Sequence, residues 1–180
     1  MGQPKQLLVY EGQTLVRRAA ETALASVCRP VVVVLGANAV AVGNELELPV
    51  IVTRNGAWET WMASSLRSGL EAVLAADDGV NSVVVMLCDQ PFVNAELIDT
   101  LIERRRETRK TIVATEYSDA RGVPTLFARE LFAEIGRLNG HEGARQIIRN
   151  HSDDTAVVTF AGAAIDIDTQ QDYETLRIAK

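Results

Sequence analysis

The hydrophobic residues along the chain alternate between two patterns, helical spacing and short apolar runs. Helical spacing, with apolar residues three and four apart, predicts helices over residues 13–27, 59–76, 94–108, 128–138, 141–150 and 169–179. Apolar runs rich in valine and isoleucine predict strands over residues 31–35, 49–55, 81–89, 111–117, 122–127, 156–160 and 163–168. Strands that alternate with helices of this length indicate βαβ units, so we expect an α/β fold with a mostly parallel sheet covered on both faces.

Two of the predicted helix starts carry side chains that suit helix caps. Asn94 precedes the helix that runs to about residue 108, and Asn is a preferred N-cap residue. Thr169 and Asp172 resemble a capping box, with Asp in place of the usual Glu or Gln. The chain itself opens on the loop MGQPKQLL, and no strand leads into this loop. An α/β domain of this pattern normally starts with a strand, so we expect a sheet that lacks its first strand.

Composition narrows the class of protein. The 180 residues predict one domain over 1–180, with no linker, internal repeat or low-complexity tract. A net charge of −6 disfavours nucleic-acid binding, and the longest apolar runs are strand-sized rather than long enough to cross a membrane. The two cysteines form neither a disulfide framework nor a zinc motif, and Met1 is not followed by a secretory leader. These features predict a cytoplasmic protein.

Acidic residues follow two of the predicted strands, at the edge where ligands of an open parallel sheet gather. Asp89 comes directly after a buried run, where a carboxylate suits Mg²⁺ but can equally end the strand and bond the Gln-Pro turn. Asp166 and Asp168 alternate with apolar residues, so both should face the same side of their strand. Asp168 can also cap the helix that follows, and its position alone leaves the cap and the metal ligand open.

Other polar residues have a structural explanation beside a functional one. Lys5 lies in a Gly- and Pro-containing loop, where a lysine is usually solvated. Ser64 and Ser65 stand at a helix start, where serine commonly satisfies backbone N–H groups. Residues 140–145 lead into a helix N-terminus, which can hold an anion. No nucleophile–base pair stands out, so these residues alone do not define a reaction.

Several segments taken together resemble one protein family. MGQPKQLL resembles the end of the nucleotidyltransferase signature, in which a strand runs into the loop L-A-A-G-x-S-x-R-M-G-x-P-K-x-L-L. CDQP resembles the D-Q-P segment of molybdenum cofactor cytidylyltransferases, and RNGAWETWMASSLRSGL, RGVPTLF, NGHEGAR and DIDTQQDY are similar to the remaining blocks in order. The chain is identified as a member of the MobA-like NTP transferase family, closest to these cytidylyltransferases. The resemblance implies a three-layer, doubly wound, nucleotide-diphospho-sugar transferase-like fold whose first strand and most of whose Gly-rich loop are absent.

The resemblance also implies a reaction and assigns residues to it. The terminal phosphate of molybdopterin attacks the α-phosphorus of a nucleoside triphosphate, with CTP favoured, and pyrophosphate leaves. Lys5 and Asp89 match catalytic residues of the family, Lys5 on the phosphates and Asp89 on Mg²⁺, and Asp168 is expected as the second metal carboxylate. On the nucleotide, besides Lys5, the resemblance places Leu35, Gly36, Ala37, Ser64, Ser65 and Arg67. On the acceptor side it places Gly122, Pro124, His141 and Arg145.

Two departures from the family pattern keep the function open. Trp61 stands where the family usually has a small residue, and His141 stands where an Asp is common. Three interpretations compete: an active cytidylyltransferase, a related transferase with another nucleotide or acceptor, and a non-catalytic module that binds cofactor or a molybdoenzyme. The expected partners are therefore a nucleoside triphosphate, a molybdopterin-type acceptor, and a molybdoenzyme or its maturation factor. Self-association through exposed sheet edges is also expected.

Overall fold

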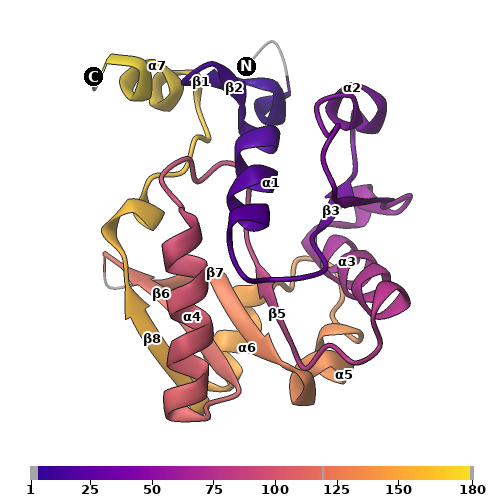
Figure 1. The fold of residues 1–180 in the computed structure, drawn as a ribbon, viewed down its shortest axis with the longest axis vertical. Coiled ribbons are helices and arrows are strands. Elements are labelled where there is room, and N and C mark those ends of the chain that lie inside the picture. The colour runs from indigo at the N-terminus through magenta and orange to yellow at the C-terminus, as the bar shows by residue number, and fades with distance from the viewer. Residues whose placement is uncertain (1–3, 119, 179–180) are drawn as a thin grey trace.

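The computed structural model describes residues 4–118 and 120–178 (Figure 1). The strands are β1 (Val9–Tyr10), β2 (Gln13–Thr14), β3 (Val32–Leu35), β4 (Ile51–Arg54), β5 (Ser82–Val85), β6 (Ile112–Tyr117), β7 (Ala120–Ala128) and β8 (Thr155–Thr159). The α-helices are α1 (Leu15–Ala25), α2 (Ala39–Gly43), α3 (Met62–Ala76), α4 (Ala95–Thr108), α5 (Phe132–Ile135), α6 (Ala144–Asn150) and α7 (Gln170–Ile178). Short 3₁₀ turns are η1 (Lys5–Leu7), η2 (Trp58–Thr60), η3 (Arg129–Leu131), η4 (Ser152–Asp154) and η5 (Ala161–Ala164).

Strand direction confirms the expected α/β class with a mostly parallel sheet. The larger sheet has the order β5-β7-β6-β8, and β3 and β4 form a separate parallel pair. β5 and β6 are both antiparallel to β7, while β6 is parallel to β8. β5, β6 and β8 therefore run in one direction, and β7 is the antiparallel exception among them.

Helices cover both faces of the larger sheet. Two neighbouring side chains of β6 show this, because they pack against helices on opposite faces. Ile112 packs with α3, α5 and α6 in one core cluster, whereas its neighbour Val113 packs with Leu101 of α4 in another. Both strand residues are fully buried, as expected where successive side chains point to opposite faces. α4 therefore forms one outer layer, and α3, α5 and α6 form the other (Figure 1).

The two sheets are separated by a cavity rather than joined. Within the described residues, β3 pairs only with β4, and β5 pairs only with β7. A cavity of about 1310 Å³ is lined by both of these strands and by residues of α1 and α3. The backbone edges of β3 and β5 that face it have no strand partner among the described residues.

Three predicted elements differ from the structure. The predicted strand 163–168 is wrong: the 3₁₀ turn η5 occupies its start, and the rest joins no sheet. Its apolar alternation arises because Ile167 is buried in a small core with Leu8 and Leu15, while its backbone N–H donates to the Asp89 carbonyl at 3.0 Å. The predicted helix 128–138 is α-helical only over α5, after the turn η3.

The third difference lies at the start of the first helix. Gln13 and Thr14, predicted to be helical, form β2 and pair with β1 around Glu11 and Gly12. Both turn residues have positive φ, 50° and 82°, the conformation that two-residue hairpin turns require. The helix begins only at Leu15, which enters the core.

The two predicted helix caps are confirmed. The side chain of Asn94 accepts a hydrogen bond from the backbone of Leu97 at 2.9 Å, at the start of α4. Thr169 and Asp172 bond each other reciprocally: the Asp172 N–H donates to Thr169 Oγ1 at 3.1 Å, and the Thr169 N–H donates to Asp172 Oδ2 at 2.7 Å. Among the residues that the structure describes, no helix is long and apolar enough to cross a membrane.

Candidate active site

Three residues from distant parts of the chain meet beyond the carboxyl end of β5. Lys5 begins the turn η1, Asp89 lies in the loop after β5, and Asp168 lies just before α7. Lys5 Nζ donates to Asp89 Oδ2 at 2.5 Å and to Asp168 Oδ1 at 2.9 Å. Since Thr169 and Asp172 form the cap of α7, the Asp168 side chain is left to bind Lys5. The structure thus brings together the three residues that were assigned to phosphates and metal.

The charges of this cluster are strongly coupled. Partial burial opposes the charge on Lys5, but hydrogen bonds and attraction from Asp89 and Asp168 outweigh it and hold the pKa of Lys5 above its ordinary value. Asp166 lies close by, and burial together with the negative charge of Asp89 raises the pKa of its carboxyl. Burial and Asp89 also raise the pKa of Cys88 to about 11, so this thiol stays protonated at neutral pH.

One carboxylate oxygen of Asp89 has no hydrogen-bond partner among the described residues. Asp89 is only 8% exposed, and its Oδ1 is buried without a donor among the described residues. A buried carboxylate oxygen without a partner is costly unless a ligand satisfies it. No group of three His, Cys, Asp or Glu side chains in the described residues could hold a metal by itself. Asp89 and Asp168 fit a hard cation that takes its other ligands from water and substrate phosphates, as Mg²⁺ commonly does.

The residues assigned to the nucleotide divide into two sets. Leu35, Gly36, Ala37 and Ser65 line the same cavity as Lys5 and Asp89. A Cβ at Gly36 would lie 2.8 Å from Trp58 Cβ, so the backbone there depends on glycine.

The second set supports the walls of the cavity instead. Ser64 is buried and donates to the carbonyls of Ala57 and Trp61, at 3.0 and 2.8 Å. Arg67 does not line the cavity, and its guanidinium donates to the carbonyl of Leu138. In this structure both side chains are engaged by protein backbone, and their contact with a nucleotide stays a prediction.

Asn55 organises this wall, and the sequence assigned it no role. Its Nδ2 donates to Ser64 Oγ at 2.7 Å and to Ser65 Oγ at 3.0 Å. Its Oδ1 accepts from the Ala57 N–H at 2.9 Å, and the residue is 6% exposed. No local pattern in the sequence signals this role, because it depends on side chains after β4 and at the start of α3 meeting in space.

Of the four residues assigned to the acceptor side, two line the cavity and two do not. His141 and Arg145 line the cavity. Gly122 and Pro124 lie within β7, where their carbonyls accept hydrogen bonds from Thr125 and Thr115 at 2.5 and 2.6 Å. A Cβ at Gly122 would lie 2.5 Å from Tyr117 Oη, so close packing explains this glycine. The role of these residues toward an acceptor is a prediction that no contact here tests.

Comparison with known proteins defines the class. Over residues 1–155 the chain matches the family model described as the MobA-like NTP transferase domain. It is 36% identical over 153 residues to nicotine blue oxidoreductase of Paenarthrobacter nicotinovorans, which covers 81% of this chain and 73% of that protein. It is similar to the crystal structure of Rv0371c from Mycobacterium tuberculosis H37Rv, with a TM-score of 0.83 and 28% identity over 100% of this chain and 92% of that one.

A second structure of Rv0371c, in complex with manganese, is similar with a TM-score of 0.80 and 27% identity, over 98% of this chain and 92% of that one. The α/β fold is the nucleotide-diphospho-sugar transferase-like fold. Within that class, the chain belongs to the MobA-like NTP transferase domain family.

Proposed function

We propose that this chain joins a nucleotide to the terminal phosphate of a molybdopterin-type acceptor, with CTP as the favoured nucleotide and pyrophosphate as the leaving group. The observation that carries the proposal is the position of the Lys5 ammonium between Asp89 and Asp168, at 2.5 and 2.9 Å. Two carboxylates that can bind a cation, beside a lysine ammonium that can pair with phosphates, are the groups that phosphoryl transfer needs.

The proposed step forms one bond and breaks one. A terminal phosphate oxygen of the acceptor attacks the α-phosphorus, and the bond from that phosphorus to the pyrophosphate oxygen breaks. A divalent cation held by Asp89 and Asp168 supplies charge neutralisation on the phosphates when bound. Lys5 pairs with the phosphates, and Ser65 and the Gly36 backbone shape the wall on which the nucleotide lies. Mg²⁺ is the expected cation.

The choice of CTP rests on the CDQP resemblance and not on a contact. Gln90 of that segment is 4% exposed, and its Nε2 donates to the carbonyls of Val123 and Ala163 at 3.2 and 2.9 Å. The Nε2 hydrogen bonds tie this side chain to β7 and η5. The nucleotide must therefore be identified by experiment.

A second candidate is a related transferase with another nucleotide or acceptor. The observation that favours it is the contact between Trp61 and His141, two residues that depart from the family pattern and meet with ring centroids 3.8 Å apart. A wall altered in this way suits a ring system other than that of molybdopterin. An accessory role, binding cofactor or a molybdoenzyme without chemistry, remains the third interpretation.

The experiment is pyrophosphate release with Mg²⁺, measured for CTP, GTP and ATP, with and without molybdopterin. We expect release that requires both CTP and molybdopterin and exceeds release with GTP at least tenfold, or about 1.4 kcal/mol. Equal rates with CTP and GTP would support the second candidate. Nucleotide binding without any release, with any acceptor tried, would support the accessory role.

A further inference from the structure

The two tryptophans of the chain lie together beside the cavity. Trp58 and Trp61 belong to the turn between β4 and α3, and they are 44% and 58% exposed. Met62, the next residue, is 54% exposed and lines the cavity. The chain is only 5% aromatic, so two neighbouring exposed tryptophans are an unusual concentration of aromatic surface.

The backbone of Trp61 has a conformation that favours glycine. Its φ is 74° and its ψ is −173°, a region that side chains with a Cβ rarely occupy. The turn is nevertheless held firmly: Ser64 Oγ donates to the Trp61 carbonyl at 2.8 Å, and Asn55 holds Ser64 in turn at 2.7 Å. The protein thus keeps a large aromatic ring at a strained position and presents that ring to solvent.

The ring of Trp61 is covered in part by His141. The two ring centroids are 3.8 Å apart with an interplanar angle of 37°, so the rings touch without lying parallel. His141 is exposed and comes from the loop before α6, on the wall that was assigned to the acceptor. It lies between Gly140 and Gly143, where an added Cβ would meet no described atom within 4 Å. The His141 side chain is exposed, whereas the Trp61 turn is fixed by its hydrogen bonds.

We propose that Trp61 is a stacking platform for the planar heteroaromatic ring of a substrate, and that His141 occupies this platform until the ring replaces it. A flat π-system gains from stacking on an exposed indole, and a fixed platform loses little freedom when it binds. The inference rests on the proposed function in one respect: the ring is expected to belong to a molecule whose phosphates reach Lys5.

Two sources of such a ring are compatible with the position. The nucleobase is one, because Trp58 of the same turn packs against Gly36 on the nucleotide wall. The ring of a pterin-type acceptor is the other, because His141 lies on the acceptor wall. Both share the chemistry that the platform recognises, and the test distinguishes them.

The test uses Trp61 as its own probe. In a Trp58→Phe background, which keeps the Cβ that contacts Gly36, Trp61 is the sole tryptophan and its fluorescence reports on the platform. We expect quenching by CTP and GTP, or by free pterin, and none by inorganic triphosphate. Quenching by the nucleotides assigns the nucleobase, and quenching by pterin assigns the acceptor. A signal that responds equally to inorganic triphosphate, or to none of the probes, would overturn the inference.

Substitutions separate a binding role from a structural one. Trp61→Phe should retain affinity for the quenching ligand within about threefold, because a flat ring remains. Trp61→Gly should raise the melting temperature, because the strain is relieved, and should weaken that ligand at least tenfold. His141→Ala should bind it as tightly as the parent or more tightly. A Trp61→Gly protein that binds as well as the parent would refute the platform.

The same titrations distinguish this inference from the proposed function. Mn²⁺ alone, and inorganic triphosphate titrated in the presence of Mn²⁺, report on the cation and phosphate site, and Asp89→Asn should weaken both. If Asp89→Asn weakens them while Trp61→Gly changes nothing, the platform alone fails. If Asp89→Asn leaves both unchanged while Trp61 is still quenched, the proposed function fails and the platform stands.

Discussion

Two lysine–aspartate contacts in the described part of the chain, Lys110–Asp154 and Lys5–Asp89, differ in how fully the aspartate is hydrogen-bonded. Lys110 and Asp154 lie at the amino ends of β6 and β8, and Lys5 and Asp89 lie beyond the carboxyl end of β5. β5, β6 and β8 run in the same direction, so the pairs belong to opposite ends of one sheet.

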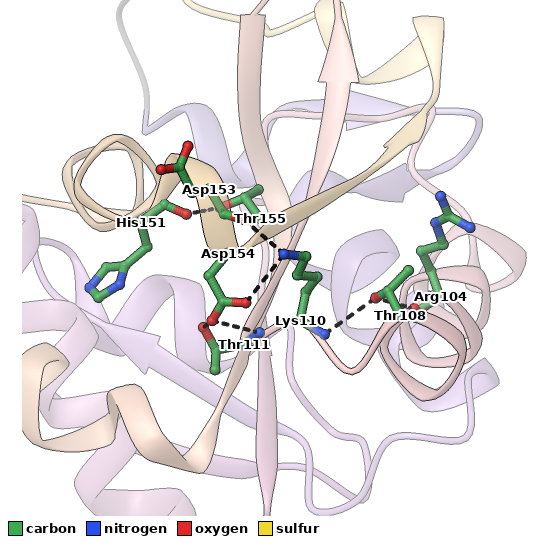
Figure 2. Close-up of polar contacts among 8 residues, drawn as sticks. All are labelled: Arg104, Thr108, Lys110, Thr111, His151, Asp153, Asp154 and Thr155. Carbon is green, nitrogen blue, oxygen red and sulfur yellow. Dashed lines mark hydrogen bonds and ion pairs between the residues drawn. The ribbon is translucent and has the colours of Figure 1, made fainter.

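The pair at the amino ends is satisfied by its neighbours, as Figure 2 shows. Asp154 Oδ2 accepts from both the N–H and the hydroxyl of Thr111, at 3.3 and 2.5 Å. Lys110 Nζ lies 3.8 Å from Asp154 Oδ1 and donates to the Asp153 carbonyl at 2.8 Å. The hydrogen bond from Thr111 holds the pKa of Asp154 below its ordinary value. These bonds tie the start of β6 to the start of β8.

The pair at the carboxyl ends is not satisfied in this way. Asp89 is buried, shares Lys5 with a second carboxylate, and keeps one oxygen without a donor in the described part of the chain. An ion pair alone does not mark a functional site. The markers are the end of the sheet on which it lies and the lone pairs that the protein leaves unused.

The largest effect that follows is on catalysis. Asp89→Asn should lower Mg²⁺-dependent pyrophosphate release about 100-fold or more, because a neutral amide binds the cation weakly. Lys5 keeps Asp168 as a charge partner in this variant, and the melting temperature checks that the loss of activity is not a loss of folding. Asp154→Asn is the matched control and should release pyrophosphate at the parent rate. Equal losses in the two variants would mean that the pairs do not differ in function.

A smaller effect is expected on cation affinity. Lys5→Met removes the positive charge between Asp89 and Asp168, so Mn²⁺ should bind about tenfold more tightly in the absence of nucleotide. Binding is measured by calorimetry or by the loss of the free Mn²⁺ spectrum. Lys110→Met, at the satisfied pair, should leave Mn²⁺ affinity unchanged. An affinity that falls in Lys5→Met would show that the ammonium does not compete with the cation.

A still smaller effect concerns stability. Asp154→Ala removes an acceptor of two hydrogen bonds at a largely exposed position, so the free energy of unfolding should fall by about 1 kcal/mol. Chemical denaturation measures it. Asp153→Ala is the control, because Lys110 bonds the carbonyl of Asp153 rather than its side chain. A loss in Asp153→Ala as large as in Asp154→Ala would deny that the carboxylate ties the strands.

The fold class and the cluster of Lys5, Asp89 and Asp168 could be predicted from the sequence. The side-chain contacts that support the cavity walls could not. Lys5 lies 84 residues from Asp89 and 163 from Asp168, and family resemblance together with strand order brought them together. Local periodicity failed at residues 163–168, because Ile167 is buried by a small core outside the sheet. Neither the role of Asn55 nor the contact between Trp61 and His141 could be predicted, since each depends on side chains meeting across loops.

The smallest expected effect is a change in the free energy of unfolding that occurs only at acidic pH. The pKa of Asp154 in the folded protein lies below its ordinary value of 3.8, so the charged form is favoured by folding. Its contribution to stability is therefore fully present above the unfolded pKa and is lost as the pH falls through the folded one. Asp154→Asn keeps an acceptor for Thr111 but cannot titrate. The difference in unfolding free energy between parent and variant should be constant from pH 5 to neutrality, and should shrink below about pH 4. A difference that instead changed between pH 5 and 7 would assign the dependence to another group.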